Sequence, residues 1–210
     1  MLTRRNLLAA AAGAVASPLL LPSREARAAA WFWVPSYAQA RNLSCEFAAC
    51  VAAMAAWGTW VSEYQFDDLV GWSENPHWGY RGDINGPWGG TVDYGVYAEP
   101  LAWALPNFGY WGDVFYAGGD VSALTWRLDA GYPTVVWTSN LGNTGWTEWT
   151  ADGTPYLLVP GQHTVVVHGY DDGGVNVMDP QFGQTDYYTW GDFSWRWGVF
   201  DGMSMAVRPL

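Results

Sequence analysis

Two cysteines are the only side chains in this sequence that could serve as a thiol nucleophile. Cys45 follows Ser44 at the start of an alanine-rich segment, where the N–H groups and dipole of a helix N-terminus would stabilise a thiolate. Helical geometry is expected to turn the neighbouring Glu46 away from this thiol. Cys50 lies further along the same helix among Ala and Val, where we expect a buried, inert thiol. Their spacing on one helix favours two free thiols, and a buried small apolar residue is the alternative interpretation of Cys45.

A base for such a thiol could come from a predicted β-hairpin. His163 begins one β-rich run, Asp179 ends the next, and residues 171–174 (Asp-Asp-Gly-Gly) are typical of a hairpin turn. The two side chains share a face of the sheet only if the numbers of paired residues add up to an even value. The four-residue turn, counted strictly, gives an odd sum, so a β-bulge or a loop of odd length is required. The alternative is a structural histidine and an aspartate that caps the turn before Pro180.

One glutamine and two further histidines complete the set of candidate polar residues. Gln39 lies six residues before Cys45, so its amide could donate to an oxyanion that forms over the Cys45 backbone N–H. The alternative is an ordinary loop glutamine. His168 should lie on the strand face opposite His163. His77 stands in a loop rich in Gly, Pro and Trp and is expected at the surface.

The composition excludes several classes of function. The formal net charge is −11 and the chain contains no lysine, which argues against nucleic acid as a partner because phosphates need a basic face. Two cysteines and three histidines are too few for several zinc sites, and no glycine-rich phosphate loop occurs. We therefore expect no metal and no cofactor. The sixteen tryptophans are expected mainly to fill the core, the alternative being a groove in which aromatic faces stack on sugars.

Residues 1–28 are predicted to be an export signal that is removed. Arg4 and Arg5 precede a short apolar run, and Ala26-Arg27-Ala28 has the small residues of a cleavage site. The paired arginines favour the twin-arginine route, and the apolar run is short for the alternative of a membrane span. Without this segment five arginines remain against nineteen acidic residues, a charge of about −14. We expect a secreted protein with no stable membrane anchor once the signal is removed.

Residues 29–210 are predicted to form a single domain of the α+β class, because helices come first and strands follow. No linker or internal repeat divides this stretch. The expected helices cover residues 44–57, 62–70, 97–105 and 121–130, and an ordered loop covers residues 75–95. The expected strands cover residues 133–138, 154–159, 163–170, 175–179, 187–189 and 203–207.

Residues 36–210 contain a pattern that resembles a known family. The pattern runs from Gln39-Ala-Arg-Asn-Leu-Ser-Cys45 through His163-Thr-Val-Val-Val to Asp179-Pro180. It is similar to papain-like cysteine peptidases of the double-glycine-leader (bacteriocin-processing) type, and most of all to their stand-alone exported branch. Glu46 stands where the transporter-fused members carry glycine, and Gln162 stands where many relatives carry glutamate. The resemblance implies a papain-like fold, in which an N-terminal helix bearing the cysteine packs on an antiparallel sheet bearing the histidine and aspartate.

The same resemblance implies a role for each candidate residue. Cys45 would be the nucleophile, His163 the general base, Asp179 the residue that orients His163, and Gln39 the oxyanion donor. We therefore predict an exported thiol hydrolase with one thiol of low pKa, which cleaves a peptide or peptidoglycan-like substrate at amide bonds through an acyl-enzyme. The alternatives are a non-catalytic cell-wall or glycan-binding protein of the same fold, and an acyl or amide transferase that uses the same triad.

Overall fold

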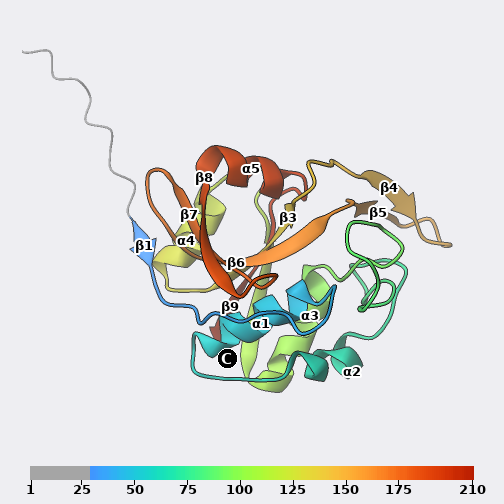
Figure 1. Cartoon of the computed structure of the whole chain (residues 1–210), viewed down its shortest axis with the longest axis horizontal. Helices are drawn as coiled ribbons and strands as arrows, with labels where there is room; N and C mark the ends of the chain where they lie inside the picture. The colour runs from blue at the N-terminus through green and yellow to red at the C-terminus, as the bar shows by residue number, and fades with distance from the viewer. Residues whose placement is uncertain (1–28) are drawn as a thin grey trace, which may run out of the picture.

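One antiparallel sheet organises the computed structural model, which describes residues 29–210 (Figure 1). The predicted export signal, residues 1–28, lies outside the described residues. The main strands, in their order across the sheet, are β2 (Tyr110–Tyr116), β9 (Met203–Pro209), β3 (Thr134–Ser139), β6 (Gln162–Tyr170), β7 (Gly174–Asp179) and β8 (Gln184–Thr189). Strand β1 (Ala30–Trp31) pairs with the end of β6, and β4 (Trp146–Trp149) and β5 (Pro155–Leu158) form a separate ribbon.

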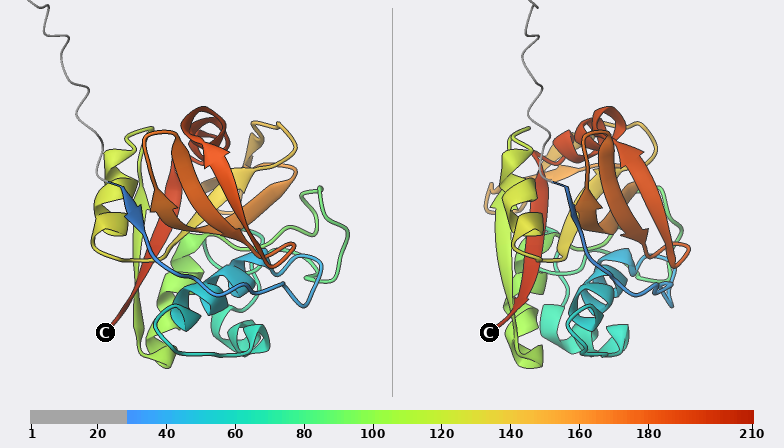
Figure 2. Two further views of the ribbon diagram at one scale, coloured as in Figure 1. Left: turned by 60° about the vertical axis from the view of Figure 1, so that its left-hand side comes forward. Right: turned by 90° about the vertical axis from the view of Figure 1, so that its left-hand side faces the viewer.

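Helices cover both faces of this sheet (Figure 2). Helices α1 (Cys45–Ala55) and α3 (Ala98–Ala104) share one apolar core with Val166 and Met178 of the sheet. Helices α4 (Ser122–Asp129) and α5 (Trp190–Gly198) share the other core with Val165 and Val177. The alternation along β6 and β7 thus sends successive side chains into different cores. The fold is α+β, and the cysteine-bearing helix α1 packs on β6, as the sequence predicts.

Helix α1 is buried along its whole length. Its many alanines allow this, because a small side chain lets neighbouring elements approach the backbone from several sides. The helix starts at Cys45, one residue later than predicted, and Gly58 with φ +93° lies beyond its last turn. Ser44 stands at the N-cap position, but its hydroxyl donates to the Arg41 carbonyl and accepts from the Arg41 N–H instead of capping the helix. Cys45 is therefore the first residue of a helix whose N-terminus has no side-chain cap.

Short helical turns connect some of these elements. The predicted helix at 62–70 is a 3₁₀ turn, η1 (Glu63–Phe66), followed by α2 (Asp67–Val70), and a second 3₁₀ turn, η2 (Leu105–Phe108), follows α3. Four elements are not predicted from the sequence: β1, β2, β4 and α5. Helix α5 contains two glycines and four aromatic residues, which are poor helix formers, and it is held by the Thr189 cap and by burial of Phe193 and Trp197.

The expectation that tryptophans fill the core is wrong. Among residues 29–210 only Trp137 and Trp197 are buried, and the other tryptophans lie partly or largely in solvent. The core is built instead from valine, alanine, leucine, methionine, phenylalanine and tyrosine side chains. Within the same residues no helix is both long enough and apolar enough to cross a bilayer.

Candidate active site

A β-bulge in β6 decides whether the candidate base and its partner share a face. Next to the hairpin turn Tyr170 pairs with Val175, so the residue numbers give an odd sum. The register shifts between Val167 and Gly169, and beyond this point Val167 pairs with Val177, an even sum. The inserted residue is His168. Side chains alternate along a strand, so the extra residue changes which β6 side chains share a face with which β7 side chains. Before the bulge, residues whose numbers add up to an even value share a face, and His163 and Asp179 are such a pair.

His163 and Asp179 meet as a result of this register. The His163 Nε2 lies 2.7 Å from Asp179 Oδ1, and both side chains are buried. The Gln181 backbone N–H donates to the same oxygen at 2.8 Å. Burial alone would raise the pKa of the Asp179 carboxyl, but the hydrogen bond and charge of His163 together bring it below its usual value. The ionised carboxylate holds the proton of His163 on Nε2, which leaves Nδ1 as the basic nitrogen.

Cys45 and His163 lie on the walls of one small cavity. Its volume is about 50 Å³, and it is lined by Gln39, Asn42, Cys45, Trp88, His163 and Gln181. Helix α1 supplies the cysteine, β6 the histidine, and the turn after β7 supplies Gln181. A hydrogen bond of 2.8 Å from the Gln39 N–H to the Pro180 carbonyl joins the segment before α1 to this turn. The cavity therefore lies where three segments distant in sequence meet.

The Cys45 thiol contacts Glu46 in this structure. Its Sγ donates to Glu46 Oε2 at 3.4 Å, so the expectation that Glu46 turns away is wrong. Burial raises the pKa of the Cys45 thiol, and the adjacent Glu46 carboxylate raises it further. Thr164 hydrogen-bonds the sulfur and opposes this effect. The thiol described here is thus neutral, which is opposite to the low pKa expected from its place at a helix N-terminus.

Gln39 reaches the cavity, but its amide hydrogens are engaged within its own loop. Nε2 donates to the Arg41 and Asn42 carbonyls, each at 2.8 Å, while Oε1 is buried without a hydrogen-bond partner in residues 29–210. An oxyanion could take one of these hydrogens only if the amide gave up a loop carbonyl. The Cys45 N–H lies in the first turn of α1, where a helix leaves its N–H groups available.

The other thiol and histidines have separate surroundings. Cys50 is a free, fully buried thiol within α1, as predicted. His168, the bulged residue, bonds the Phe32 carbonyl through Nδ1 at 2.8 Å. His77 is partly buried rather than simply at the surface, and its Nδ1 lies 2.8 Å from a Glu99 carboxylate oxygen. Of the three histidines, His163 is the one that lines the cavity with Cys45.

Other residues of the cavity have no predicted catalytic role, although Trp88 is one of the loop tryptophans that could line a groove. Trp88 lines the cavity and its indole N–H donates to the Gln162 carbonyl at 3.1 Å, across 74 residues of chain. Asn42 also lines it and donates to the Asn85 carbonyl at 3.0 Å. Both contacts join the loop at 75–95 to the site. No sequence pattern marks them, because they depend on how that loop folds.

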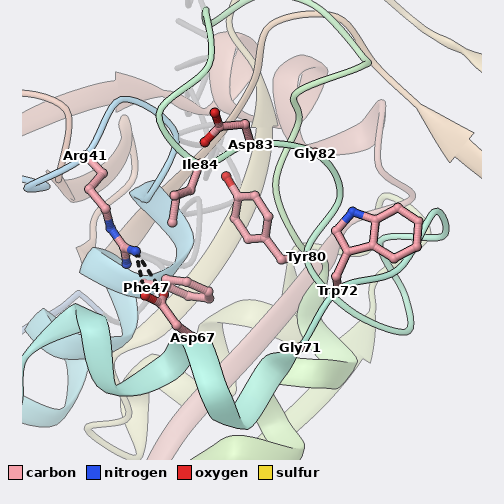
Figure 3. Close-up of a pocket in the computed structure, with 9 residues that line it drawn as sticks. All are labelled: Arg41, Phe47, Asp67, Gly71, Trp72, Tyr80, Gly82, Asp83 and Ile84. Carbon is pink, nitrogen blue, oxygen red and sulfur yellow. Dashed lines mark hydrogen bonds and ion pairs between the residues drawn. The ribbon is translucent and has the colours of Figure 1, made fainter.

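A larger cavity of about 300 Å³ is lined by Arg41, the chain neighbour of Asn42 in the first cavity (Figure 3). Arg41, held by Asp67, stands on one side, Trp72 on the other, and Tyr80 between them. The Leu43 N–H donates to the Ile84 carbonyl at 2.9 Å, which joins the segment before α1 to the wall of this cavity. Among the described residues, no cluster of His, Cys, Asp and Glu has an arrangement that could hold a metal ion.

Comparisons with known proteins point to one group. The model of a family described as "Peptidase_C39 like family" matches residues 33–205. A putative C39-like peptidase from Bacillus anthracis has a similar structure, with a TM-score of 0.70, 20% identity, and coverage of 87% of this chain and 98% of that one.

Two transporter-associated domains are also similar. One is a double-glycine motif protease from an AMS/PCAT transporter, solved with its leader peptide (TM-score 0.54, 17% identity, 86% of this chain and 95% of that chain). The other is the peptidase domain of Streptococcus ComA, a bifunctional ABC transporter of a quorum-sensing pathway (TM-score 0.54, 15% identity, 85% and 100%). At these identities the likeness concerns the fold. The search of curated proteins found no match.

Proposed function

The chain belongs to the Peptidase_C39 like family, a family of cysteine peptidase-like hydrolases, and from this premise we propose that it cleaves peptide or peptide-like amide bonds through Cys45, His163 and Asp179. The observation that carries the proposal is the buried pair of His163 and Asp179, 2.7 Å apart, on the wall of a cavity that Cys45 also lines. A base held by a carboxylate beside a thiol is the arrangement that nucleophilic catalysis requires.

The first chemical step would transfer the thiol proton. Cys45 turns its S–H from Glu46 to Nδ1 of His163, which gives a thiolate and an imidazolium. The Asp179 carboxylate stabilises the imidazolium through Nε2–H. The thiolate then attacks the substrate carbonyl, and the oxygen becomes an oxyanion. The Cys45 N–H stabilises it, joined by the Gln39 amide once that amide leaves the Arg41 or Asn42 carbonyl.

The remaining steps return the enzyme to its starting state. The imidazolium of His163 gives its proton to the leaving amine, the C–N bond breaks, and an acyl group remains on Cys45 Sγ. Water, deprotonated by His163, attacks this thioester. The acid leaves, and the sulfur recovers a proton. A transferase would differ only in that an amine takes the place of water.

The size of the cavity limits the substrate. A volume of about 50 Å³ beside Cys45, bounded by Trp88, leaves no room for a large side chain next to the cleaved bond. We therefore expect cleavage after a small residue such as glycine. A side chain further from the bond would find space in the 300 Å³ cavity of Figure 3. The leader peptide bound by the AMS/PCAT protease makes a peptide the first substrate to try.

Trapping the acyl-enzyme tests this function. Mixing the protein with an activated ester of a short peptide that ends in glycine, followed by an acid quench, is expected to add the mass of the acyl group to Cys45. Intact mass and peptide mapping measure the adduct. The Cys50→Ala variant should carry the adduct and the Cys45→Ala variant should not. If no adduct forms while the protein binds peptidoglycan or polysaccharide, the glycan-binding alternative replaces the hydrolase.

We also propose export through the twin-arginine route, on the strength of Arg4, Arg5 and the apolar run after them. Replacing both arginines with lysine keeps the charge and is expected to retain the protein in the cytoplasm, as cell fractionation would show. The matched control replaces Arg24 and Arg27 with lysine, which changes the same number of arginines outside the pair. Unchanged export of the first variant would contradict the route.

A further inference from the structure

Glu46 is a buried carboxylate that lies directly beside the candidate nucleophile. It has no exposed surface, and its Oε2 accepts the Cys45 S–H at 3.4 Å. Its other oxygen, Oε1, accepts the Val96 N–H at 3.2 Å, and the Gln162 side chain also hydrogen-bonds the carboxyl group. Each oxygen therefore has a defined partner, and Oε2 is the one turned to the sulfur.

The fold makes room for this carboxylate at a particular residue. A Cβ at Gly95 would collide with Glu46 Oε1, so only glycine leaves space for the carboxyl group there. Gly95 also has a φ of +138°, which other residues rarely adopt. The segment that carries Gly95 and Val96 thus fits around the carboxylate. A buried charge without a cation beside it destabilises the folded state. The close fit around Glu46 therefore indicates a functional role for this carboxylate.

Groups facing Glu46 do not neutralise it. The acids around it are neutral when protonated, and burial raises the pKa of each: Cys45, Cys50, Tyr80, Tyr94 and Tyr97. Arg41 and Arg81 act on Tyr80 and Tyr94, but no ion pair within residues 29–210 joins either arginine to Glu46. Strand β6 brings the neutral side chains of Gln162 and Thr164 and the imidazole of His163, which lines the cavity with Cys45. Burial raises the pKa of the Glu46 carboxyl to about 7, although the hydrogen bonds from Val96 and Gln162 lower it. Both protonation states are therefore accessible near neutral pH.

We propose that Glu46 is a positioning residue: when ionised it holds the Cys45 thiol away from His163, and when protonated it releases the sulfur and stabilises the thiolate with its own O–H. The inference rests on the proposed function, in which Cys45 is the nucleophile. In the first state the S–H proton stays on sulfur. In the second, the S–H proton moves to Nδ1 of His163 while Glu46 keeps its proton and donates a hydrogen bond to the sulfur.

This scheme reverses the usual pH dependence of a thiol. An isolated cysteine becomes more reactive as the pH rises, because more thiolate forms. Here the reactive thiolate–imidazolium pair exists while Glu46 is protonated, so reactivity is present below about pH 7 and falls as Glu46 ionises. In Glu46→Gln the amide oxygen would accept the Val96 N–H in place of Oε1. The NH₂ group would then take the place of Oε2 and face the sulfur. This variant imitates the protonated state at every pH.

The rate of alkylation of Cys45 by iodoacetamide tests the proposal without any substrate. Peptide mapping by mass spectrometry, from about pH 5.5 to 8.5, separates Cys45 from Cys50. The native rate is expected to fall on the order of tenfold as the pH rises through 7, which corresponds to one pKa unit of interaction. In Glu46→Gln the fall should disappear. Glu99→Gln, which alters a carboxylate on α3 that bonds His77 and Tyr116, should keep the native profile.

Each result decides the question. A native rate that rises through pH 7, or a Glu46→Gln profile like the native one, overturns the role of Glu46. If Glu46→Gln does not fold, Glu46→Asp replaces it, since a shorter side chain draws the carboxylate back from the sulfur and should weaken the fall. Because alkylation needs no turnover, a protein with the expected profile but no acyl-enzyme would contradict the proposed function, while the control of the Cys45 thiol by Glu46 would still be shown.

Discussion

Replacing Cys45 with alanine is expected to lower kcat/KM for peptide hydrolysis by about 10⁴-fold or more, because no acyl-enzyme can form without the sulfur. The effect should be confined to turnover. Cys45 packs at the first turn of α1, and alanine is already the commonest residue of that helix. The variant should therefore fold like the native protein. The measurement is hydrolysis of a peptide whose cleavage by the native protein has been established, with thermal unfolding recorded in parallel.

Cys50→Ala is the matched control for this result. It removes the same sulfur five residues along the same helix, where the thiol is fully buried and outside the cavity. It should remain active. Full activity of Cys45→Ala would exclude the thiol mechanism, and an equal loss in both variants would indicate that α1 tolerates no loss of sulfur, which is a structural effect.

Replacing His163 with alanine is expected to lower kcat/KM by about 10³- to 10⁴-fold, since the thiol loses its base and the leaving amine loses its acid. The loss should appear mainly in kcat, because His163 lines the cavity but its role lies in proton transfer. Some loss of stability should accompany it. Asp179 would keep only the Gln181 N–H on its buried carboxylate, and a buried charge that loses its partner is destabilising.

His168→Gln is the control for the histidine. His168 belongs to the same strand and is equally buried, but it does not line the cavity. Its Nδ1 hydrogen-bonds the Phe32 carbonyl instead. Glutamine can still donate to that carbonyl, so the variant should stay active. If His168→Gln lost as much activity as His163→Ala while remaining folded, the assignment of the base would be wrong.

The sequence predicts the hairpin and the condition for pairing His163 with Asp179, because turn residues and strand alternation are local properties. It does not locate the bulge. Strand β1 lies against Gly169, where a Cβ would approach the Ala30 carbonyl oxygen to 2.9 Å, and the Phe32 N–H donates to the His168 carbonyl. Residues more than 130 positions away therefore accompany the register shift, and no pattern within the hairpin shows them.

The surroundings of the thiol could not be predicted for the same reason. The sequence places Glu46 next to Cys45, where a carboxylate would disfavour the thiolate. The orientation of this carboxylate, however, depends on Gly95 and Val96, some fifty residues later. The tryptophans were misjudged on different grounds. Aromatic content alone predicts burial, whereas a chain with so many alanines and valines fills most of its interior with smaller side chains and buries only Trp137 and Trp197 among the tryptophans of residues 29–210.

The bulge at His168 limits which insertions and deletions this protein can tolerate in evolution. Adding or deleting one residue within the paired parts of β6 or β7, between His163 and Asp179, would carry one of them to the opposite side of the sheet, unless the bulge were lost or moved at the same time. Changes by two residues would preserve the pairing. The turn between β6 and β7 obeys no such counting, because its length does not change which strand residues pair. Descendants of this protein should therefore vary in the length of the hairpin turn freely, but in strands β6 and β7 by even steps.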